Sequence, residues 1–294
     1  MGQWPRVGTG LAVIGHPISH SVSPQMHNAA LAALALREPR FRDWRYHAFD
    51  IEPARLGEAL AALHERGFKG VNLTVPHKVV AMGIVTSVDS GAGDAGAVNT
   101  LAAEEDGWRG FNTDGYGLRA GIQADLGVSL HGTPVILLGA GGAARAAAVA
   151  CLHAGCASLK IVNRNPANLA ALIAHVRPLA EGREVAGWTP GGAQVPVAPG
   201  SILINATSLG LKAGDPAPVD LAQWAGVAAV YDMIYNPPVT ALLAQAAGIP
   251  GIRAANGLGM LVHQGAKALE IWTGTLASEL APVMRAAAAK ALGS

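Results

Sequence analysis

The sequence has little charge, few aromatic residues and almost no cysteine. Of its 294 residues, 14% are charged, 5% are aromatic and two are cysteines, and the formal net charge is +1. The charged share lies well below the roughly 25% typical of globular domains, and much of the hydrophobic share of 51% is alanine, which suits helices. No basic run and no cluster of basic and aromatic residues occurs, so the composition argues against a nucleic-acid partner.

Long hydrophobic runs are missing as well. The longest stretch without a charged residue, 185–211, is interrupted by Pro190, Pro196 and Pro199 and cannot form a membrane-spanning helix. The first residues lack the basic segment and the apolar run of a signal peptide. We therefore expect a cytoplasmic protein without a membrane partner.

The two cysteines and ten histidines form no metal-binding pattern. Cys151 and Cys156 are five residues apart, without metal-site spacing, and we expect them to be buried packing residues in a reducing compartment. His16 and His20 are four apart, but Pro17 between them argues against a helix. The sequence therefore predicts no metal site.

The most informative stretch is a short strand that runs into a glycine turn and then a helix. Residues 135–138 are all apolar, as in a buried parallel strand, and 143–152 are rich in alanine. Between them the spacing G-x-G-x-x-A suggests that Gly139 makes the turn, Gly141 lets backbone approach a pyrophosphate, and Ala144 keeps the helix close. The helix start would then bind the phosphates of a dinucleotide. A glycine turn that binds nothing remains the alternative.

The end of the next predicted strand, 159–162, bears on which dinucleotide binds. An acidic residue there would accept from the ribose hydroxyls and repel a 2′-phosphate, but this chain has Asn163-Arg164-Asn165 instead. An arginine can pair with a phosphate and stack on adenine at once. The sequence therefore predicts NADP, with NAD less favoured.

Alternating strands and helices before and after the glycine turn predict two α/β domains. The second contains further strands over 201–205 and 228–232, an order that predicts a parallel, doubly wound sheet of Rossmann type. Two apolar helices, 260–272 and 276–292, end the chain.

Polar residues gather near the strand ends of the first domain. A strand over 11–15 leads to a loop with Ser21 and Ser23; Ser23 suits the N-cap of the next helix, with Pro24 in its first turn. Ser21 has no such local role, so the two serines could hold hydroxyl or carboxylate groups of a small polar ligand.

A further predicted strand, 70–76, has Asn72 and Thr74 on one face and leads directly to Lys78. This face is either the floor of a ligand site or an ordinary half-exposed strand. Asp114 opens a predicted helix that reaches about Leu126, where it could cap backbone donors or take part in chemistry.

Several short motifs follow one another in a distinctive order. They are 15–24 followed by His27-Asn28, then 72–78, 96–100, 112–115, the glycine turn, 163–164, 205–210, 231–237 and 257–264. In this order, and over essentially the whole length, the chain resembles the shikimate dehydrogenases. The resemblance implies a reversible, NADP-linked reduction of 3-dehydroshikimate to shikimate. It also implies a substrate-binding domain over 1–113, completed by 259–294, and an NADP-binding Rossmann domain over 114–258.

The resemblance also implies roles for individual residues. The implied catalytic pair is Lys78 and Asp114. The substrate residues are Ser21 and Ser23 for the carboxylate, Thr74, Asn99, Asp114 and Gln264 for the ring hydroxyls, and Asn72 and Tyr235 in the same cleft. The cofactor residues are Gly139, Ala140, Gly141, Gly142, Ala143, Asn163, Arg164, Asn165, Thr207, Met233 and Gly257.

Three positions depart from the family pattern, and two alternatives remain open. Asn168 stands where many NADP-preferring members have a second arginine, Asn165 where threonine or serine is common, and Gly265 where alanine is usual. The alternatives are a quinate or aminoshikimate enzyme, with NAD open as its cofactor, and a non-catalytic paralogue that senses a ligand. Ser23 argues against the first, since quinate-using relatives often have threonine there, and the pair Lys78 and Asp114 argues against the second. The sequence leaves monomer and homodimer open.

Overall fold

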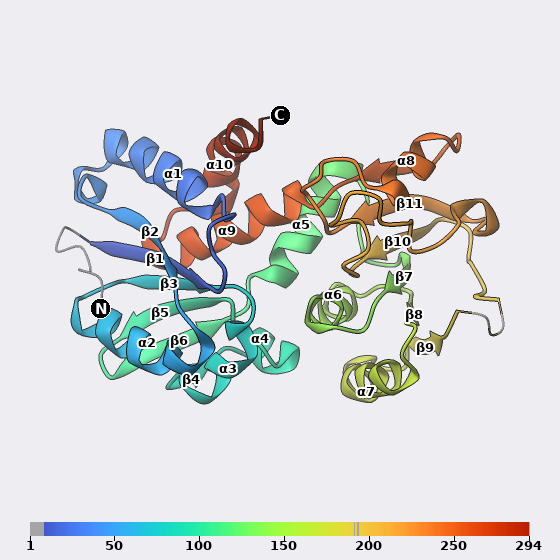
Figure 1. Ribbon diagram of the computed structural model, residues 1–294, viewed down its shortest axis with the longest axis horizontal. Helices are drawn as coiled ribbons and strands as arrows, with labels where there is room; N and C mark the ends of the chain where they lie inside the picture. Colours follow the sequence, from blue (N-terminus) through green and yellow to red (C-terminus); the bar gives the residue numbers. More distant parts are fainter. Residues whose placement is uncertain (1–8, 191, 193, 294) are drawn as a thin grey trace. The chain divides into compact units, whose positions relative to one another are not determined.

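The computed structural model describes residues 9–190, 192 and 194–293, and the chain divides into two compact units. The first unit comprises the chain up to Thr113 together with the part from Val262 onwards, and the second comprises Asp114–Leu261. The sequence led us to expect divisions after residues 113 and 258. Figure 1 shows that each unit contains a β-sheet with helices packed against it.

The first unit has a mixed six-stranded sheet in the order β2-β1-β3-β5-β6-β4. Its strands are β1 (Gly10–Gly15), β2 (Arg45–Asp50), β3 (Gly70–Leu73), β4 (Ser87–Val88), β5 (Thr100–Glu104) and β6 (Gly107–Phe111). Strand β1 is parallel to both β2 and β3, whereas β5 is antiparallel to β3 and β6. The carboxyl ends of β1, β2 and β3 therefore lie at one edge, where the predicted polar loops begin.

The first unit also contains helices. They are α1 (Ser23–Arg37), α2 (Leu56–Glu65), α3 (His77–Val80), α4 (Ser90–Ala95), α9 (Leu258–Thr273, which begins in the second unit) and α10 (Ala277–Leu292). Each of the first two buries one apolar face: Met26, Ala30, Leu31 and Leu34 of α1 and Leu56, Leu60 and Leu63 of α2 are all buried.

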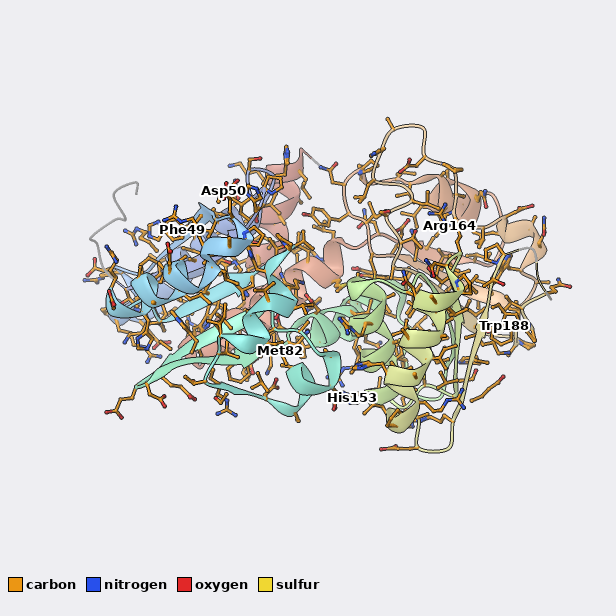
Figure 2. All side chains as sticks on the ribbon, turned by 60° about the horizontal axis from the view of Figure 1, so that its bottom comes forward. Phe49, Asp50, Met82, His153, Arg164 and Trp188 are labelled. Carbon is orange, nitrogen blue, oxygen red and sulfur yellow. The ribbon has the colours of Figure 1, made fainter. Side chains whose placement is uncertain are left out.

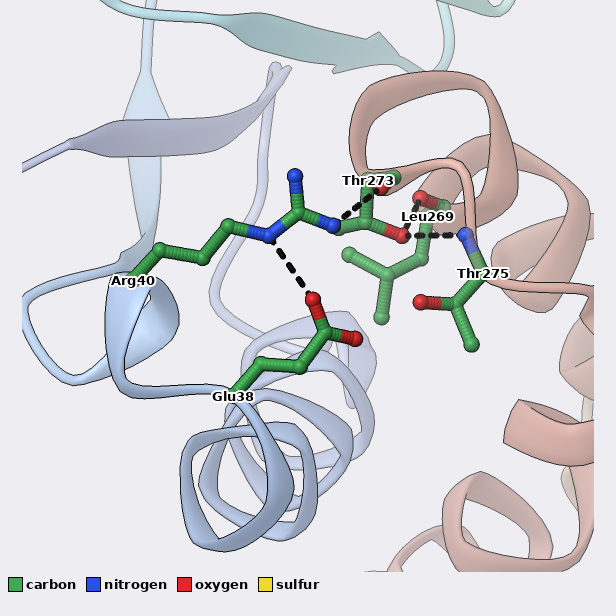
Figure 3. Close-up of polar contacts among 5 residues, drawn as sticks. All are labelled: Glu38, Arg40, Leu269, Thr273 and Thr275. Carbon is green, nitrogen blue, oxygen red and sulfur yellow. Dashed lines mark hydrogen bonds and ion pairs between the residues drawn. The ribbon is translucent and has the colours of Figure 1, made fainter.

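The last helices return to the first unit, as the family resemblance implied. The Trp272 indole donates to the Leu101 carbonyl at 2.9 Å, and its ring lies over Gly70, where any side chain would collide with it. Arg40 donates to the Thr273 carbonyl at 3.3 Å and to Glu38 at 2.9 Å (Figure 3). These contacts tie the end of α9 to segments more than 170 residues away in sequence.

The second unit has six parallel strands in the order β12-β11-β10-β7-β8-β9. They are β7 (Pro134–Leu138), β8 (Ser158–Val162), β9 (Glu184–Trp188), β10 (Ser201–Asn205), β11 (Val227–Asp232) and β12 (Arg253–Ala255). The remaining helices are α5 (Asp114–Leu126), α6 (Gly142–His153), α7 (Pro166–Val176) and α8 (Ala241–Ala247). The order reverses between β7 and β10, which is the switch point where such sheets bind ligands. The expected doubly wound fold is confirmed.

Burial on both faces explains why β7 is continuously apolar. Val135 and Leu137 pack into one core cluster, whereas Ile136 and Leu138 pack into the cluster on the other face. Cys151 and Cys156 are free thiols in the first of these clusters, so their predicted packing role is confirmed. Among the helices of the described residues, none is long and apolar enough to span a membrane.

Some local predictions were wrong. The strand expected over 70–76 ends at Leu73, Val75 is 69% exposed, and Lys78 lies on the short helix α3 rather than at a strand end. The short elements α3, β4 and α4 and the strand β9 were not predicted at all. None of these errors changes the fold class.

Candidate active site

The serine loop leads from β1 into α1. Ser21 accepts a hydrogen bond from the Ser23 amide at 3.3 Å, and Ser23 is the first helical residue. The prediction that Ser23 is the N-cap was wrong: Val22 precedes the helix, and no side chain caps it. Ser21 therefore has a local contact, with the Ser23 amide, that the sequence did not predict, while Pro24 lies in the first turn as expected.

An acidic residue that sequence reasoning missed holds this loop. Asp50, at the end of β2 (Figure 2), accepts from the His16 ring at 2.6 Å and from the Ile18 amide at 3.3 Å. The Ile18 carbonyl in turn accepts from the Ser21 amide at 3.0 Å. The hydrogen bond from His16 holds the pKa of Asp50 below its ordinary value, so its carboxylate stays charged.

Asn72 is the centre of a buried hydrogen-bond network. It donates to the Asn99 carbonyl at 3.1 Å and to the Thr100 hydroxyl at 2.9 Å, and it accepts from the Tyr46 hydroxyl at 2.7 Å. Both of its amide protons are therefore used inside the protein. The geometry indicates that Asn72 positions its neighbours, a role different from the substrate contact implied by the resemblance.

Asn99 extends this network to the start of α5. Its side-chain oxygen accepts from the Thr113 amide at 2.8 Å, and its nitrogen donates to the Thr113 hydroxyl at 3.1 Å. The residue after Thr113 is Asp114, the first residue of α5, which is buried. Asn99 thus fixes the segment from which the predicted catalytic carboxylate projects.

Thr74 and Lys78 lie on the loop and short helix that follow β3. The Thr74 carbonyl accepts from the His77 amide at 2.9 Å, and the Lys78 carbonyl accepts from the Val98 amide at 2.9 Å. Gly15 has no side chain where the Thr74 methyl packs, which lets the loops after β1 and β3 converge. The structure therefore brings Ser21, Ser23, Thr74, Lys78 and Asn99 to one edge of the sheet in the first unit.

A buried histidine connects the serine helix to the helix that carries Gln264. His27 donates from Nδ1 to the Ser23 carbonyl at 2.9 Å, and its ring stacks on Tyr46 with centroids 4.0 Å apart. A methyl group at Gly265, the residue after Gln264, would lie 3.2 Å from the His27 ring, so the departure to glycine relieves crowding here. Burial lowers the pKa of His27 to about 4.

We expect His27 to make the protein less stable in mild acid. The neutral ring is favoured in the folded state, whereas the unfolded chain binds a proton below its ordinary pKa of 6.5. Its contribution is therefore complete above pH 6.5 and is lost as the pH falls toward 4, by up to about 1.4 kcal/mol per pH unit. Urea unfolding of wild type and His27→Phe between pH 7.5 and 4.5 measures this.

The His27→Phe variant should be less stable at neutral pH but should show a flatter dependence on pH. The exposed His131, replaced by glutamine, provides the control, and its pH dependence should match that of wild type. An unchanged pH dependence in His27→Phe would refute the assignment. A residual slope is expected because burial also lowers the pKa of His47 and His77.

In the second unit the glycine turn has the geometry expected of a phosphate site. Gly139 has φ of +111°, and its amide donates to the Val162 carbonyl at 2.8 Å. A methyl group at Gly141 or Gly142 would meet nothing within 4 Å, so the start of α6 is open. Ala144 is fully buried, which allows the close packing of the helix that the sequence predicted.

The three residues after β8 have different contacts. Asn165 is the N-cap of α7, and its side-chain oxygen accepts from the amides of Ala167 and Asn168 at 2.9 and 3.1 Å. Asparagine, serine and threonine are all good N-caps, which explains the departure from the family pattern at this position. Asn163 donates to the Asn165 carbonyl at 2.9 Å. Arg164 is exposed (Figure 2).

Two buried residues at the ends of β10 and β11 shape the loops that carry Thr207 and Met233. Asn205 accepts from the Thr207 hydroxyl at 2.7 Å and donates to Asp232 at 3.0 Å. Asp232 also accepts from the Thr240 hydroxyl at 2.6 Å. Sequence reasoning assigned no role to Asn205 or Asp232, although a polar residue at the end of an apolar strand is a recognisable signal. Burial raises the pKa of Asp232.

Gly257 and Tyr235 complete the predicted set in this unit. The Gly257 amide donates to the Ile234 carbonyl at 3.0 Å, and any side chain at Gly257 would collide with the Met233 carbonyl. Burial raises the pKa of Tyr235, so its hydroxyl stays protonated and can donate. No group of three His, Cys, Asp or Glu residues in the described part of the chain could hold a metal ion.

A parallel, doubly wound sheet with an open glycine turn, joined to an α/β unit with polar strand ends, defines an NAD(P)-dependent oxidoreductase of two domains. Family models described as shikimate dehydrogenase substrate binding domain and shikimate 5'-dehydrogenase C-terminal domain match residues 13–101 and 257–289. The chain belongs to the shikimate dehydrogenase family.

Individual relatives support this membership over nearly the full length. A shikimate dehydrogenase (NADP(+)) of Citrifermentans bemidjiense is 42% identical over 273 residues, which cover 91% of this chain and 90% of the relative. The solved shikimate 5-dehydrogenase of Thermus thermophilus, in complex with NADP(H) and shikimate, is 35% identical with a TM-score of 0.79 and covers 95% of this chain and 99% of its own. A 5-ketofructose reductase of Gluconobacter sp. strain CHM43 has 33% identity and a TM-score of 0.82, covering 95% and 98%.

Proposed function

We propose that this protein catalyses the reversible NADPH-dependent reduction of 3-dehydroshikimate to shikimate. The observation that carries the proposal is the convergence of Ser21, Ser23, Thr74, Lys78 and Asn99 at one sheet edge of the first unit. Hydroxyls, an ammonium group and an amide suit a ligand with one carboxylate and several ring oxygens. The 42% identical relative named for this reaction supports the same conclusion.

In this proposal a set of polar side chains binds and activates the ring acid. Ser21 and Ser23 hold the carboxylate, and Thr74, Asn99, Asp114 and Gln264 hold ring oxygens, with Tyr235 at the same ligand. Lys78 donates a proton to the carbonyl oxygen as negative charge develops there, and Asp114 orients its ammonium group. Asn72, whose donors are engaged internally, positions Asn99.

The cofactor supplies the hydride to the carbonyl carbon. The open backbone of Gly139 to Ala143 fits its pyrophosphate, and Arg164 with Asn163 and Asn165 fits the adenosine end. Strand β10 borders the switch point, and β11 is its neighbour on the other side. Three residues lie in or beside the loops after these strands, and we assign them to the nicotinamide end: Thr207, Met233 and Gly257. The absence of an acidic residue after β8 supports NADP over NAD.

A steady-state assay tests the proposal. Purified protein is assayed with shikimate and quinate, each with NADP and NAD, and with 5-ketofructose and NADPH because one structural neighbour is named for that ketone. We expect the highest kcat/KM with shikimate and NADP. A preference for quinate or 5-ketofructose would assign a different substrate, and binding without turnover would favour a sensing role.

We also propose a cytoplasmic protein that acts as a monomer or homodimer on small molecules and does not bind nucleic acid. The two free, buried cysteines suit a reducing compartment, and the net charge of +1 gives no electrostatic footprint for nucleic acid. Light scattering at several protein concentrations distinguishes the two assembly states.

A further inference from the structure

A positively charged side chain lies in the N-terminal turn of α6, where the charge of the helix itself is unfavourable for a cation. Arg145 is in the first turn of this helix, and its amide donates to the Gly141 carbonyl at 2.9 Å. The first turn of a helix carries partial positive charge, so a cation there is destabilising unless an anion compensates. The first turn of α6 contains no acidic residue, and no side chain caps it.

Arg145 lines a pocket of about 270 Å³ between α6 and α7. On one side lie Gly141 and Gly142 of the glycine turn, and on the other lie Asn168 and His175 of α7. Asn168 and His175 are seven residues apart, two turns along one face of that helix. Of the lining residues within the described part of the chain, none is acidic, so the pocket is suited to an anion.

The structure leaves the arginines of this region available for a ligand. Within the residues described, no hydrogen bond or ion pair engages the side chain of Arg145 or of Arg164. Arg164 follows β8, directly before Asn165, which starts α7. The first turn of α7 contributes the neutral Asn168 and no basic residue. Among the described residues that line the pocket, Arg145 is the one arginine, and Arg164 follows β8 outside this lining.

We propose that Arg145 binds the 2′-phosphate of NADP in this pocket, together with Arg164, and so sets the preference for NADP over NAD. The inference rests on the proposed function, because it takes NADP as the cofactor. A guanidinium offers two parallel donors to a phosphate, and the phosphate supplies the negative charge that the first turn of α6 lacks. Asn168 adds a neutral donor from α7.

The competing role for Arg145 is contact with the pyrophosphate, and the two roles make different predictions. The pyrophosphate is common to NAD and NADP, so losing such a contact weakens both cofactors alike. The 2′-phosphate is present only in NADP, so losing that contact weakens NADP alone. The ratio of the two dissociation constants separates these roles without relying on catalysis.

Calorimetric titration of NADP⁺ and NAD⁺ into wild type, Arg145→Ala and Arg145→Gln tests the inference. We expect Kd for NADP⁺ to rise about tenfold to a hundredfold, as for loss of a charge-assisted hydrogen bond. Kd for NAD⁺ should change less than about threefold, which also shows that the variant is folded. Arg164→Ala should also raise Kd for NADP⁺, and the exposed Arg177→Ala, beyond the far end of α7, should match wild type.

Moving the arginine from α6 to α7, on the other side of the pocket, tests where the phosphate binds. In the Arg145→Ala background, Asn168→Arg should restore part of the NADP⁺ affinity, and failure to do so would overturn the placement between α6 and α7. An equal loss for both cofactors, or no loss in Arg145→Ala, would overturn the role of Arg145. A wild-type protein that binds neither cofactor would instead refute the proposed function.

Discussion

Lys78→Ala is expected to lower kcat by about 10² to 10⁴, with a smaller change in KM for the ring acid. When hydride reaches the ring carbonyl, negative charge develops on its oxygen, and a positioned acid lowers the barrier by donating a proton as that charge appears. Lys78 is suited to this task because α3 and the Val98 segment fix its backbone beside Asn99. An interaction formed chiefly in the transition state affects kcat more than KM.

The alternative is that Lys78 only attracts the substrate carboxylate. In that case its removal would raise KM and leave kcat nearly unchanged at saturating substrate, and the catalytic role would be wrong. Initial rates over a full range of shikimate at saturating NADP distinguish the two outcomes. Lys69→Ala is the matched control, because this exposed lysine precedes β3 and carries no predicted role.

The glycine turn and the sheet around it were predictable because their determinants are local. The buried strand β7, the positive φ of Gly139 and the buried Ala144 all follow from eleven consecutive residues. The apolar faces of α1 and α2 repeat with helical spacing and were equally readable. In each case the sequence near a residue decides its environment.

The residues that position the site depend on contacts distant in sequence. Asp50 meets the serine loop across 34 residues, and Asn205 meets Asp232 across 27. A single sequence contains no periodicity that reports such pairs. Short elements were missed for a related reason: β4 has two residues, and β9 is a half-buried edge strand of five, so neither shows a clear alternation.

For Lys78 the predicted secondary structure was wrong, but the predicted position at the carboxyl end of a strand was not affected. Alternation of apolar and polar residues suggested a strand to Pro76, but the chain turns after Leu73, with the Thr74 carbonyl accepting from the His77 amide. Val75 consequently faces solvent, and Lys78 starts from a helix. Thr74 and Lys78 still lie at the carboxyl end of β3, because they follow this strand directly in the chain. The turn changes only the direction that the chain takes there.

Two glycines of one turn should respond to alanine in different ways. Gly141→Ala is expected to leave stability unchanged, since its φ of −87° suits any residue and a methyl group there meets nothing within 4 Å. It should nevertheless raise Kd for NADP⁺ and for NAD⁺ about tenfold to a hundredfold, because the methyl group keeps the pyrophosphate from the backbone amides.

Gly139→Ala should instead lower stability. Its φ of +111° costs an L-residue about 1 to 3 kcal/mol, and the methyl group would lie 3.1 Å from the Ala206 carbonyl oxygen. Thermal unfolding and calorimetric titration of both variants separate a role in binding from a role in folding. If Gly141→Ala bound both cofactors as wild type does, the start of α6 would not be the pyrophosphate site. If Gly139→Ala kept the wild-type melting temperature, the turn would have to adopt a different backbone conformation from the one in this structure.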